Sequence, residues 1–333
     1  MKLETAYNFV IKLTTNCPAN CKCCINRKKE IKLKDENNKT FDKTDFERIC
    51  QCLKKMKGSY ICLSGGEPTI VSNINEYFYI AHKNKLATRI NTNGWNITKE
   101  KMKEWLTLGL EQIVLSIYSL DKTTLKTIRG NEELLNKSLN AAKILSEFRE
   151  NYDFTFVIQT VIMKDNYNEM AEILKFAIEN NVDIFWPSYL EDAFNLPLIR
   201  MQKKDIAKFK KDIIPKMKMV IYNSWIDTHQ SQYLEVCLDN LYRKEYNNYI
   251  YHDKSFKCNW LGKHLTFYPN GTVYPCPGHD YFSSSIQYKI DYSKIDELFI
   301  DSLLKNINNM PANCKYCPQG VYQEINLQNV SRL

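Results

Sequence analysis

Apolar and polar positions follow two alternating periods along the first 200 residues. Short apolar, β-branched runs of strand length alternate with longer stretches whose apolar residues recur at helical spacing. The predicted strands are residues 7–14, 59–63, 87–90, 112–119, 154–163 and 184–187. The predicted helices are 42–57, which Thr44 caps, 73–85, 98–109, 131–150 and 167–180. Six such alternations predict a parallel sheet with right-handed crossovers, in the form of a partial (β/α)6 TIM-like barrel.

The pattern changes after residue 200. A lysine-rich amphipathic helix is predicted over 203–222, and a tyrosine-rich segment at 232–249 has helical character. Next come a hairpin with its turn at Asn270-Gly271 and a helical stretch over 295–308. We therefore expect three parts, which are an α/β barrel at 1–200, a helical bridge at 201–255 and a small α+β module at 256–333.

Composition places the chain among ordinary globular proteins. It has 333 residues, of which 44% are hydrophobic and 25% charged. No stretch approaches the ~20 apolar residues that span a bilayer, and the start has no apolar signal core, so a cytoplasmic protein without membrane contact is expected. The net charge of +8 is spread over the chain, which does not favour nucleic-acid binding. Twelve cysteines indicate metal or redox chemistry.

Four of these cysteines fall within eight residues, directly after the first predicted strand. Cys17, Cys21 and Cys24 form a Cys-x3-Cys-x2-Cys pattern, and soft thiolate ligands select iron-sulfur clusters or zinc. Three protein ligands on a four-iron cube leave one iron open. A zinc knuckle or a disulfide is the alternative, but the next cysteine is Cys50 and zinc needs a fourth ligand. Cys23 either packs on the cluster or competes with Cys24 as the third ligand.

This spacing after a first strand resembles the signature of the radical S-adenosylmethionine (radical SAM) superfamily. The resemblance implies that the open iron binds the amino and carboxylate groups of SAM. A second motif follows the second predicted strand, and its glycines permit close backbone approach to a ligand. The matching family segment grips the ammonium group of SAM, and here it comprises Gly65, Gly66, Glu67 and Pro68.

The resemblance extends to polar residues at later strand ends. It implies that Asn91 or Asn93 lines the cavity, that Ser116 contacts the ribose and that Gln159 faces the adenosine. Arg129 belongs to an arginine-glycine pair of the kind that follows the fourth strand in this superfamily. A tight turn at Asn93, a solvated Arg129 and a simple alternating strand at Gln159 are the alternatives.

The last third of the chain carries a second cysteine set, with one pair in a Cys-x2-Cys arrangement. The set is similar to the auxiliary-cluster extension called SPASM, or Twitch in its shortened form, and implies one auxiliary [4Fe-4S] cluster. Its ligands are expected to be Cys258, Cys276, Cys314 and Cys317, with structural zinc as the alternative. Cys237 is either structural or a hydrogen-atom donor to a substrate radical.

The resemblance implies reductive cleavage of SAM and hydrogen-atom abstraction from a substrate by the 5'-deoxyadenosyl radical, with flavodoxin or ferredoxin as the reductant. Because the cysteine loop begins at residue 17, without room for a leader-binding domain, the expected substrate is a small polar molecule such as an amino sugar or nucleotide. The alternatives are a maturase of a ribosomally made peptide and a non-enzymatic electron-transfer or metal-binding protein. Residues expected to contact the substrate are Trp186, Tyr189, Glu191 and Asp192.

Overall fold

A single curved sheet organises the part of the chain that the computed structural model describes, which is residues 7–24, 40–189, 198–222, 224, 263–275 and 288–306. The order of its nine strands is β6-β5-β4-β3-β2-β1-β7-β8-β9. The strands are β1 (Asn8–Lys12), β2 (Tyr60–Ser64), β3 (Ala87–Thr92), β4 (Leu110–Ser116), β5 (Thr155–Ile162), β6 (Ile184–Tyr189), β7 (His264–Phe267), β8 (Thr272–Tyr274) and β9 (Tyr288–Lys289).

Helices alternate with these strands along the chain. They are α2 (Lys43–Lys55), α3 (Ile74–Lys83), α4 (Lys99–Thr107), α5 (Lys122–Arg129), α6 (Glu133–Arg149), α7 (Met170–Glu179), α8 (Lys203–Lys208), α9 (Ile214–Tyr222) and α12 (Glu297–Asn306), with short 3-10 turns at Pro68–Ile70, Tyr167–Glu169 and Tyr292–Lys294.

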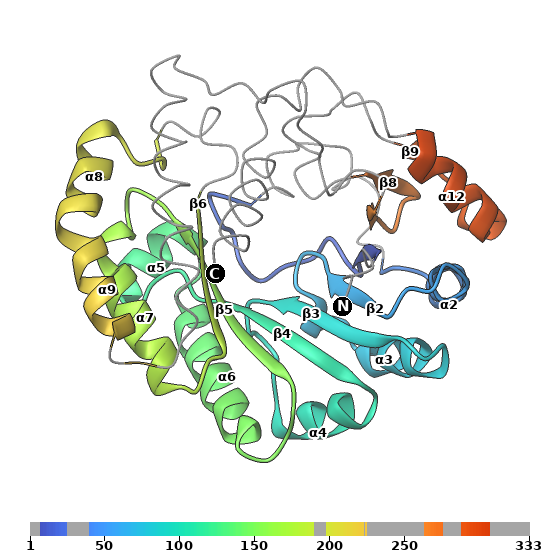
Figure 1. The fold of residues 1–333 in the computed structure, drawn as a ribbon, viewed down its shortest axis with the longest axis horizontal. Helices are drawn as coiled ribbons and strands as arrows, with labels where there is room; N and C mark the ends of the chain where they lie inside the picture. The colour runs from blue at the N-terminus through green and yellow to red at the C-terminus, as the bar shows by residue number, and fades with distance from the viewer. Residues whose placement is uncertain are drawn as a thin grey trace, which may run out of the picture.

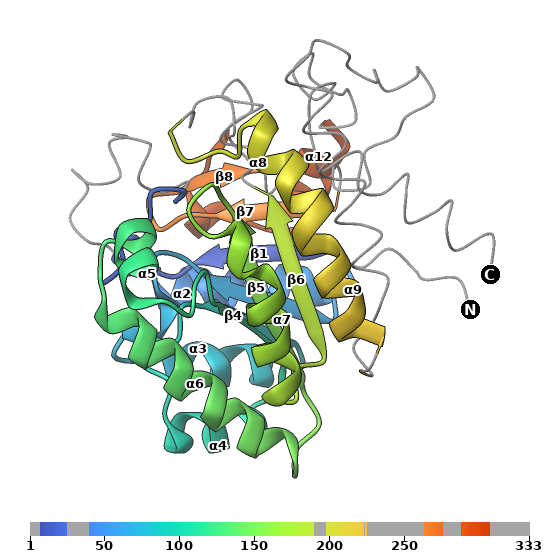
Figure 2. The ribbon, with the colours of Figure 1, turned by 90° about the vertical axis from the view of Figure 1, so that its left-hand side faces the viewer.

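The first six strands are all parallel to their neighbours. The helices that connect them cover the convex side of the sheet and leave its concave side free of helices from these connections (Figures 1 and 2). This arrangement confirms the predicted α/β fold with a partial barrel. Since parallel strands end at the same edge of a sheet, the segments that follow β1, β2, β3 and β4 are brought together.

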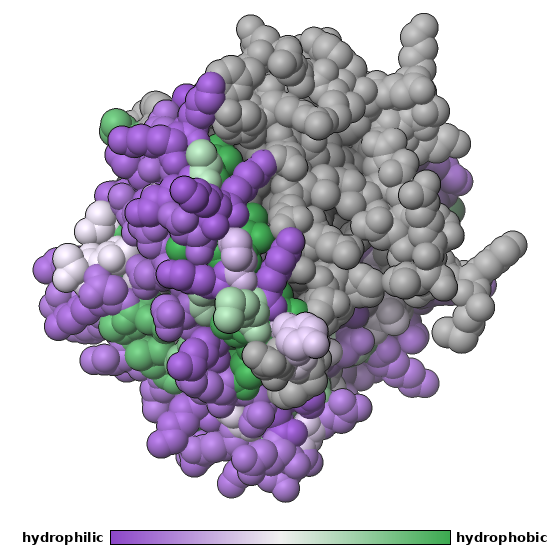
Figure 3. All heavy atoms as spheres, turned by 60° about the vertical axis from the view of Figure 1, so that its left-hand side comes forward, coloured by the Kyte–Doolittle hydropathy of each residue, from purple (hydrophilic) through white to green (hydrophobic). Residues whose placement is uncertain are grey.

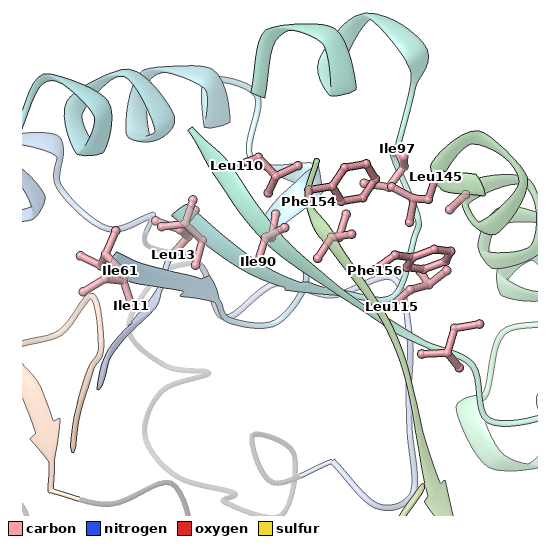
Figure 4. Packing of buried hydrophobic residues seen from close by; sticks show 14 of the residues in the cluster. Ile11, Leu13, Ile61, Ile90, Ile97, Leu110, Leu115, Leu145, Phe154 and Phe156 are labelled. Carbon is pink, nitrogen blue, oxygen red and sulfur yellow. The ribbon is translucent and has the colours of Figure 1, made fainter. Parts of the chain in front are cut away.

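The core lies between the sheet and these helices. Alternate strand residues such as Ile11, Ile61, Ile90 and Phe156 are fully buried there (Figure 4). Burial of each such side chain contributes about 1.5–3 kcal/mol to folding. Because side chains alternate across a strand, the residues between them face the concave side.

The helix prediction needs two corrections beyond small shifts of the helix ends. The cap of α2 is Asp42, whose carboxylate accepts hydrogen bonds from two backbone N–H groups of the first turn, and not Thr44. Helix α5 was not predicted, although Asp121 caps it and Gly130 ends it at a φ of +65°. The segment reads as a loop because it is only eight residues long.

Residues 203–222 of the predicted helical bridge pack on the barrel, whereas residues 225–255, with the predicted helical segment at 232–249, lie outside the described residues. Ile206, Phe209 and Met217 of 203–222 belong to the same buried cluster as the strand residues. Strand β7 pairs with β1 in parallel, so the C-terminal strands continue the barrel sheet. The predicted hairpin is confirmed, and Gly271 takes its turn with a φ of +81°. The division at residues 200 and 255 stays a prediction.

The outer surface over the helices carries mainly hydrophilic side chains, with limited hydrophobic areas between them (Figure 3). In the described part of the chain, no helix combines the length and the apolar character that crossing a membrane requires.

Candidate active site

The cysteine loop and the glycine motif run side by side at the edge where β1 and β2 end. Three backbone hydrogen bonds join the two segments: Leu13 N to Ser64 O at 2.9 Å, Gly66 N to Thr14 O at 2.6 Å and Glu67 N to Asn16 O at 2.8 Å. They extend the pairing of the two strands into the segments beyond their ends. The two motifs therefore share one site.

Both glycines are required by this close approach. A Cβ atom on Gly65 would lie 2.5 Å from the carbonyl oxygen of Thr14, and one on Gly66 would lie 2.0 Å from that of Asn16. Gly65 also has a φ of +144°, which side chains rarely tolerate. Only glycine lets the two backbones touch here.

The far side of the cysteine loop rests on the end of α5. Its contacts are backbone bonds from Asn20 N to Arg129 O at 2.6 Å and from Lys22 N to Ile128 O at 2.9 Å, and a side-chain bond from Asn131 Nδ2 to Pro18 O at 3.0 Å. The loop is thus held between the end of β2 and the helix after β4.

Two of the predicted ligand sulfurs accept N–H groups. Cys17 Sγ accepts from Ala19 N at 3.4 Å and from Asn93 Nδ2 at 3.5 Å, and Cys21 Sγ accepts from Arg129 Nε at 3.4 Å. N–H donors aimed at sulfur suit iron-sulfur ligation, because they stabilise thiolates that carry negative charge.

The described residues hold no group of three or more His, Cys, Asp or Glu side chains arranged for a single metal ion. A zinc knuckle needs such convergence on one point. Ligands of a four-iron cube bind separate irons, so the thiols of Cys17, Cys21 and Cys24 do not need to converge.

Cys23 has apolar neighbours as well as the other thiols of the loop. It contacts a small apolar cluster formed by Ile128, Met163 and Ile199, beside Tyr118. Burial raises the pKa of the Cys23 thiol well above its ordinary value. Cys24 as the third ligand stays a prediction.

Glu67 is almost fully buried, and the protein uses both oxygens of its carboxylate. Oε1 accepts from Thr69 N at 3.1 Å, Thr69 Oγ1 at 2.7 Å and Thr92 Oγ1 at 2.5 Å, and Oε2 accepts from Asn93 N at 2.6 Å. Burial raises the pKa of Glu67, and these four bonds act against that shift. Contact of Glu67 with the SAM ammonium stays a prediction.

Arg129 is buried at the end of α5 and is not the solvated side chain considered above. Besides Cys21 it contacts two neighbours: Nη1 donates to the carbonyl of Ser116 at 2.9 Å, and the guanidinium lies 4.6 Å from the centre of the Tyr118 ring. No carboxylate pairs with this guanidinium in the described residues. A buried cation beside a cysteine sulfur provides positive charge where an anionic cluster would bind.

Three predicted site residues lie in one row across the sheet. Ser116 of β4 is opposite Gln159 of β5, and Gln159 is opposite Trp186 of β6. Trp186 is 38% exposed, and Ser116 and Gln159 are half-buried. Asn91 is also half-buried, and it lies on β3 opposite Val114 of β4.

Two further predicted residues lie in the described part of the chain. Pro68 is buried at the start of the 3-10 turn, and Tyr189 is the last residue of β6. The remaining predicted residues lie outside the described residues; they are Glu191, Asp192, Cys237, Cys258, Cys276, Cys314 and Cys317.

Three residues with clear roles in the site were not predicted. Thr69 and Thr92 donate hydrogen bonds to Glu67, and the ring of Tyr118 contacts the guanidinium of Arg129. The sequence signal that could have indicated these residues is their position, directly after the glycine motif or at the end of a predicted strand. Position alone does not reveal the partner of a hydroxyl group.

The model of the radical SAM superfamily matches residues 11–177, half of the chain. The chain therefore belongs to the radical SAM superfamily. It is an enzyme, and members of this family use a [4Fe-4S] cluster and SAM. The alternative of a non-enzymatic electron-transfer or metal-binding protein is not retained.

Solved structures with a similar fold include Streptococcus suis SuiB bound to its precursor peptide SuiA, with 20% identity over 95% of this chain and 70% of SuiB, at a TM-score of 0.67. Native anSMEcpe with bound AdoMet has 17% identity over 93% of this chain and 86% of its own, at a TM-score of 0.61. A third is anSMEcpe with AdoMet and the Kp18Cys peptide, with 15% identity, the same coverage of both chains and a TM-score of 0.62. At these identities the likeness is one of fold.

We predict that Gly66→Ala prevents cluster assembly, because its Cβ must displace the backbone of Asn16. The overpacking costs about 1–3 kcal/mol of stability. Gly109→Ala is the matched control: its φ of +83° carries strain, but its Cβ would lie 3.8 Å from the nearest atom, in His82. Iron and sulfide per chain after anaerobic reconstitution should fall only for Gly66→Ala. Equal iron in both variants contradicts the role of the close approach.

We also predict that Cys17→Ala, Cys21→Ala and Cys24→Ala each lose the SAM-binding cluster, whereas Cys23→Ala keeps it, because Cys23 packs in the apolar cluster with Ile128. The measurements are the visible spectrum and the electron paramagnetic resonance (EPR) signal of the reduced protein. Retention of the signal in Cys24→Ala together with its loss in Cys23→Ala would reverse the ligand assignment.

Proposed function

We propose that this enzyme cleaves SAM reductively and takes a hydrogen atom from a peptide substrate. The main support is the meeting of the cysteine loop and the glycine motif at one strand-end edge, where Gly66 N and Thr14 O are 2.6 Å apart. An electron carrier without SAM turnover has no need of this second segment.

A bound [4Fe-4S] cluster with one open iron supplies the electron that cleaves SAM. Cys17, Cys21 and Cys24 are the proposed cluster ligands. The proposed SAM site comprises Gly65, Gly66, Glu67, Pro68, Asn91, Asn93, Ser116, Arg129 and Gln159.

The chain's own groups prepare this site in three ways. Asn93 and Arg129 donate N–H groups to Cys17 and Cys21, which stabilises the thiolates. The buried guanidinium of Arg129 offsets negative charge on the neighbouring Cys21 thiolate. Backbone contacts on both sides hold the loop in one conformation, so little rearrangement accompanies ligation.

Two observations support a peptide as substrate. The similar solved structures include one protein bound to a precursor peptide and another bound to a peptide together with AdoMet. In the enzyme itself, Trp186 lies in register with Gln159 and exposes a large aromatic surface at the last barrel strand. A small polar molecule, as expected from the sequence, is the other outcome of the test.

The test uses an extract of the source organism grown on deuterated medium as a mixed substrate. With SAM and dithionite the enzyme should form 5'-deoxyadenosine that carries deuterium from the extract. Prior treatment of the extract with protease should abolish this transfer if the donor is a peptide. Transfer that survives protease and passes a small-molecule filter identifies a small polar donor instead, and absence of 5'-deoxyadenosine formation contradicts the proposed reaction.

We further propose that Cys258, Cys276, Cys314 and Cys317 bind an auxiliary [4Fe-4S] cluster. The support is their similarity to the Twitch pattern and the position of β7, which joins the C-terminal segment to the barrel sheet beside β1. Four thiolates would close all four irons, so the cluster would transfer electrons without binding substrate. Flavodoxin or ferredoxin as reductant, and Cys237 as hydrogen-atom donor, belong to the same proposal.

Metal analysis tests the auxiliary cluster. The wild-type chain should hold about eight irons if both clusters are cubes, and Cys314→Ala with Cys317→Ala should lower this to about four while SAM cleavage remains measurable. About four irons in the wild-type chain, or zinc in place of the difference, contradicts the proposal.

A further inference from the structure

The hydrogen-bond network of Glu67 leads from the glycine motif to a cluster ligand. Its carboxylate links two strand ends, because Thr69 follows the motif after β2 whereas Thr92 and Asn93 lie at the end of β3. Asn93 in turn donates to Cys17 Sγ at 3.5 Å. The chain of contacts therefore runs from Glu67 through Asn93 to Cys17.

The direction of each bond in this network is fixed by the other partners. Thr92 Oγ1 accepts from Gly94 N at 2.9 Å, and Thr69 Oγ1 accepts from Asn96 N at 3.2 Å. Each hydroxyl proton is then free to point at Glu67 Oε1. All four groups around the carboxylate are donors, which suits an ionised carboxylate and no other side chain of this shape.

The amide of Asn93 is oriented in the same manner. Its Oδ1 accepts from Trp95 N at 2.9 Å, so the other terminal atom must be the NH2 group. That NH2 group faces Cys17. Asn93 is buried, and its backbone N–H is held by Glu67 Oε2 at 2.6 Å.

We propose that Glu67 is a positioning residue that holds Asn93 so that its amide donates to Cys17 and thereby raises the reduction potential of the SAM-binding cluster. N–H donors to cluster sulfur stabilise the reduced, more negative form. The carboxylate acts through Asn93 and does not need to touch SAM. This inference rests on the proposed function, because it takes Cys17 as a cluster ligand.

Glu67→Gln is the informative variant, because it keeps the shape of the side chain. Glutamine has one oxygen and one NH2 group. If its oxygen accepts the donors at Oε1, its NH2 group faces the N–H of Asn93, and two donors cannot bond. The variant should therefore release Asn93. Asn93→Ala removes the donor to Cys17 directly.

The measurement is an EPR redox titration of the full chain without SAM; the signal that changes on addition of SAM identifies the cluster on the cysteine loop. Asn93→Ala should move its midpoint potential to a more negative value, and Glu67→Gln should do so by a smaller amount, because it also removes a negative charge near Cys17. The double variant should move the potential no further than Asn93→Ala alone. Glu111→Gln and Asn84→Ala should leave it unchanged, because Glu111 lies at the start of β4 and Asn84 follows α3 before β3 begins, away from the strand ends that hold Glu67 and Asn93.

Other outcomes overturn the proposal. A shift for Asn93→Ala without one for Glu67→Gln means that Glu67 does not act through Asn93. An unchanged potential with weaker SAM binding in Glu67→Gln makes Glu67 the ammonium contact instead, and additive shifts in the double variant make the two residues independent. If Glu67→Gln does not fold, Thr92→Val, which removes one donor to Oε1, replaces it, and no shift in that variant also contradicts the proposal.

The proposed function fails separately. If Cys17→Ala retains the SAM-responsive signal, Cys17 is not a ligand and the ligand assignment falls. If Cys17→Ala loses the signal while the potentials of Glu67→Gln and Asn93→Ala match wild type, only the role of the network falls.

Discussion

The backbone contact between the glycine motif and the cysteine loop is the constraint on which the site depends. It places two carbonyl groups, those of Thr14 and Asn16, within hydrogen-bond reach of the N–H groups of Gly66 and Glu67. No side chain fits between the two backbones. Parallel pairing of β1 and β2 brings the segments to the same edge, and the glycines let them meet. Residues that follow in each segment are then fixed in register with one another.

Buried polar groups near this contact are satisfied within the protein. The carboxylate of Glu67 receives four donors, and the guanidinium of Arg129 donates to Cys21 and Ser116 while it stacks on Tyr118. An unpaired buried charge costs several kcal/mol, roughly 3–5 when one partner of a buried pair is removed. Pairing of these buried charges therefore stabilises the strand-end loops in addition to packing. Arg129 and Asn93, whose backbone N–H donates to Glu67, contact the sulfurs of Cys21 and Cys17.

The sequence predicts most of the fold, because the periodicity of apolar residues is a local property. All six barrel strands and the hairpin at Gly271 follow from it, whereas α5 was missed since eight residues give too short a pattern. The site was predicted only as a set of positions. Which atoms Glu67 contacts depends on Thr92 and Asn93, which are more than twenty residues away in sequence. Composition and spacing carry no information on such pairings.

The end of β3 and the end of α5 each contribute one side-chain donor to a cysteine sulfur, and neither donor is interchangeable. Arg129 donates to Cys21 and to the carbonyl of Ser116 from two nitrogens of its planar guanidinium, which lies over the ring of Tyr118, and a lysine at this position has no such pair of nitrogens. Asn93 needs an oxygen for Trp95 and an NH2 group for Cys17, which Asp and Ser cannot both supply. The loop backbone is thus fixed by glycine and helix contacts, and its sulfurs are fixed by two side chains of defined shape. The position of the cysteine ligands therefore depends on the backbone contacts of the loop, whereas the charge around their sulfurs depends on the side chains of Asn93 and Arg129.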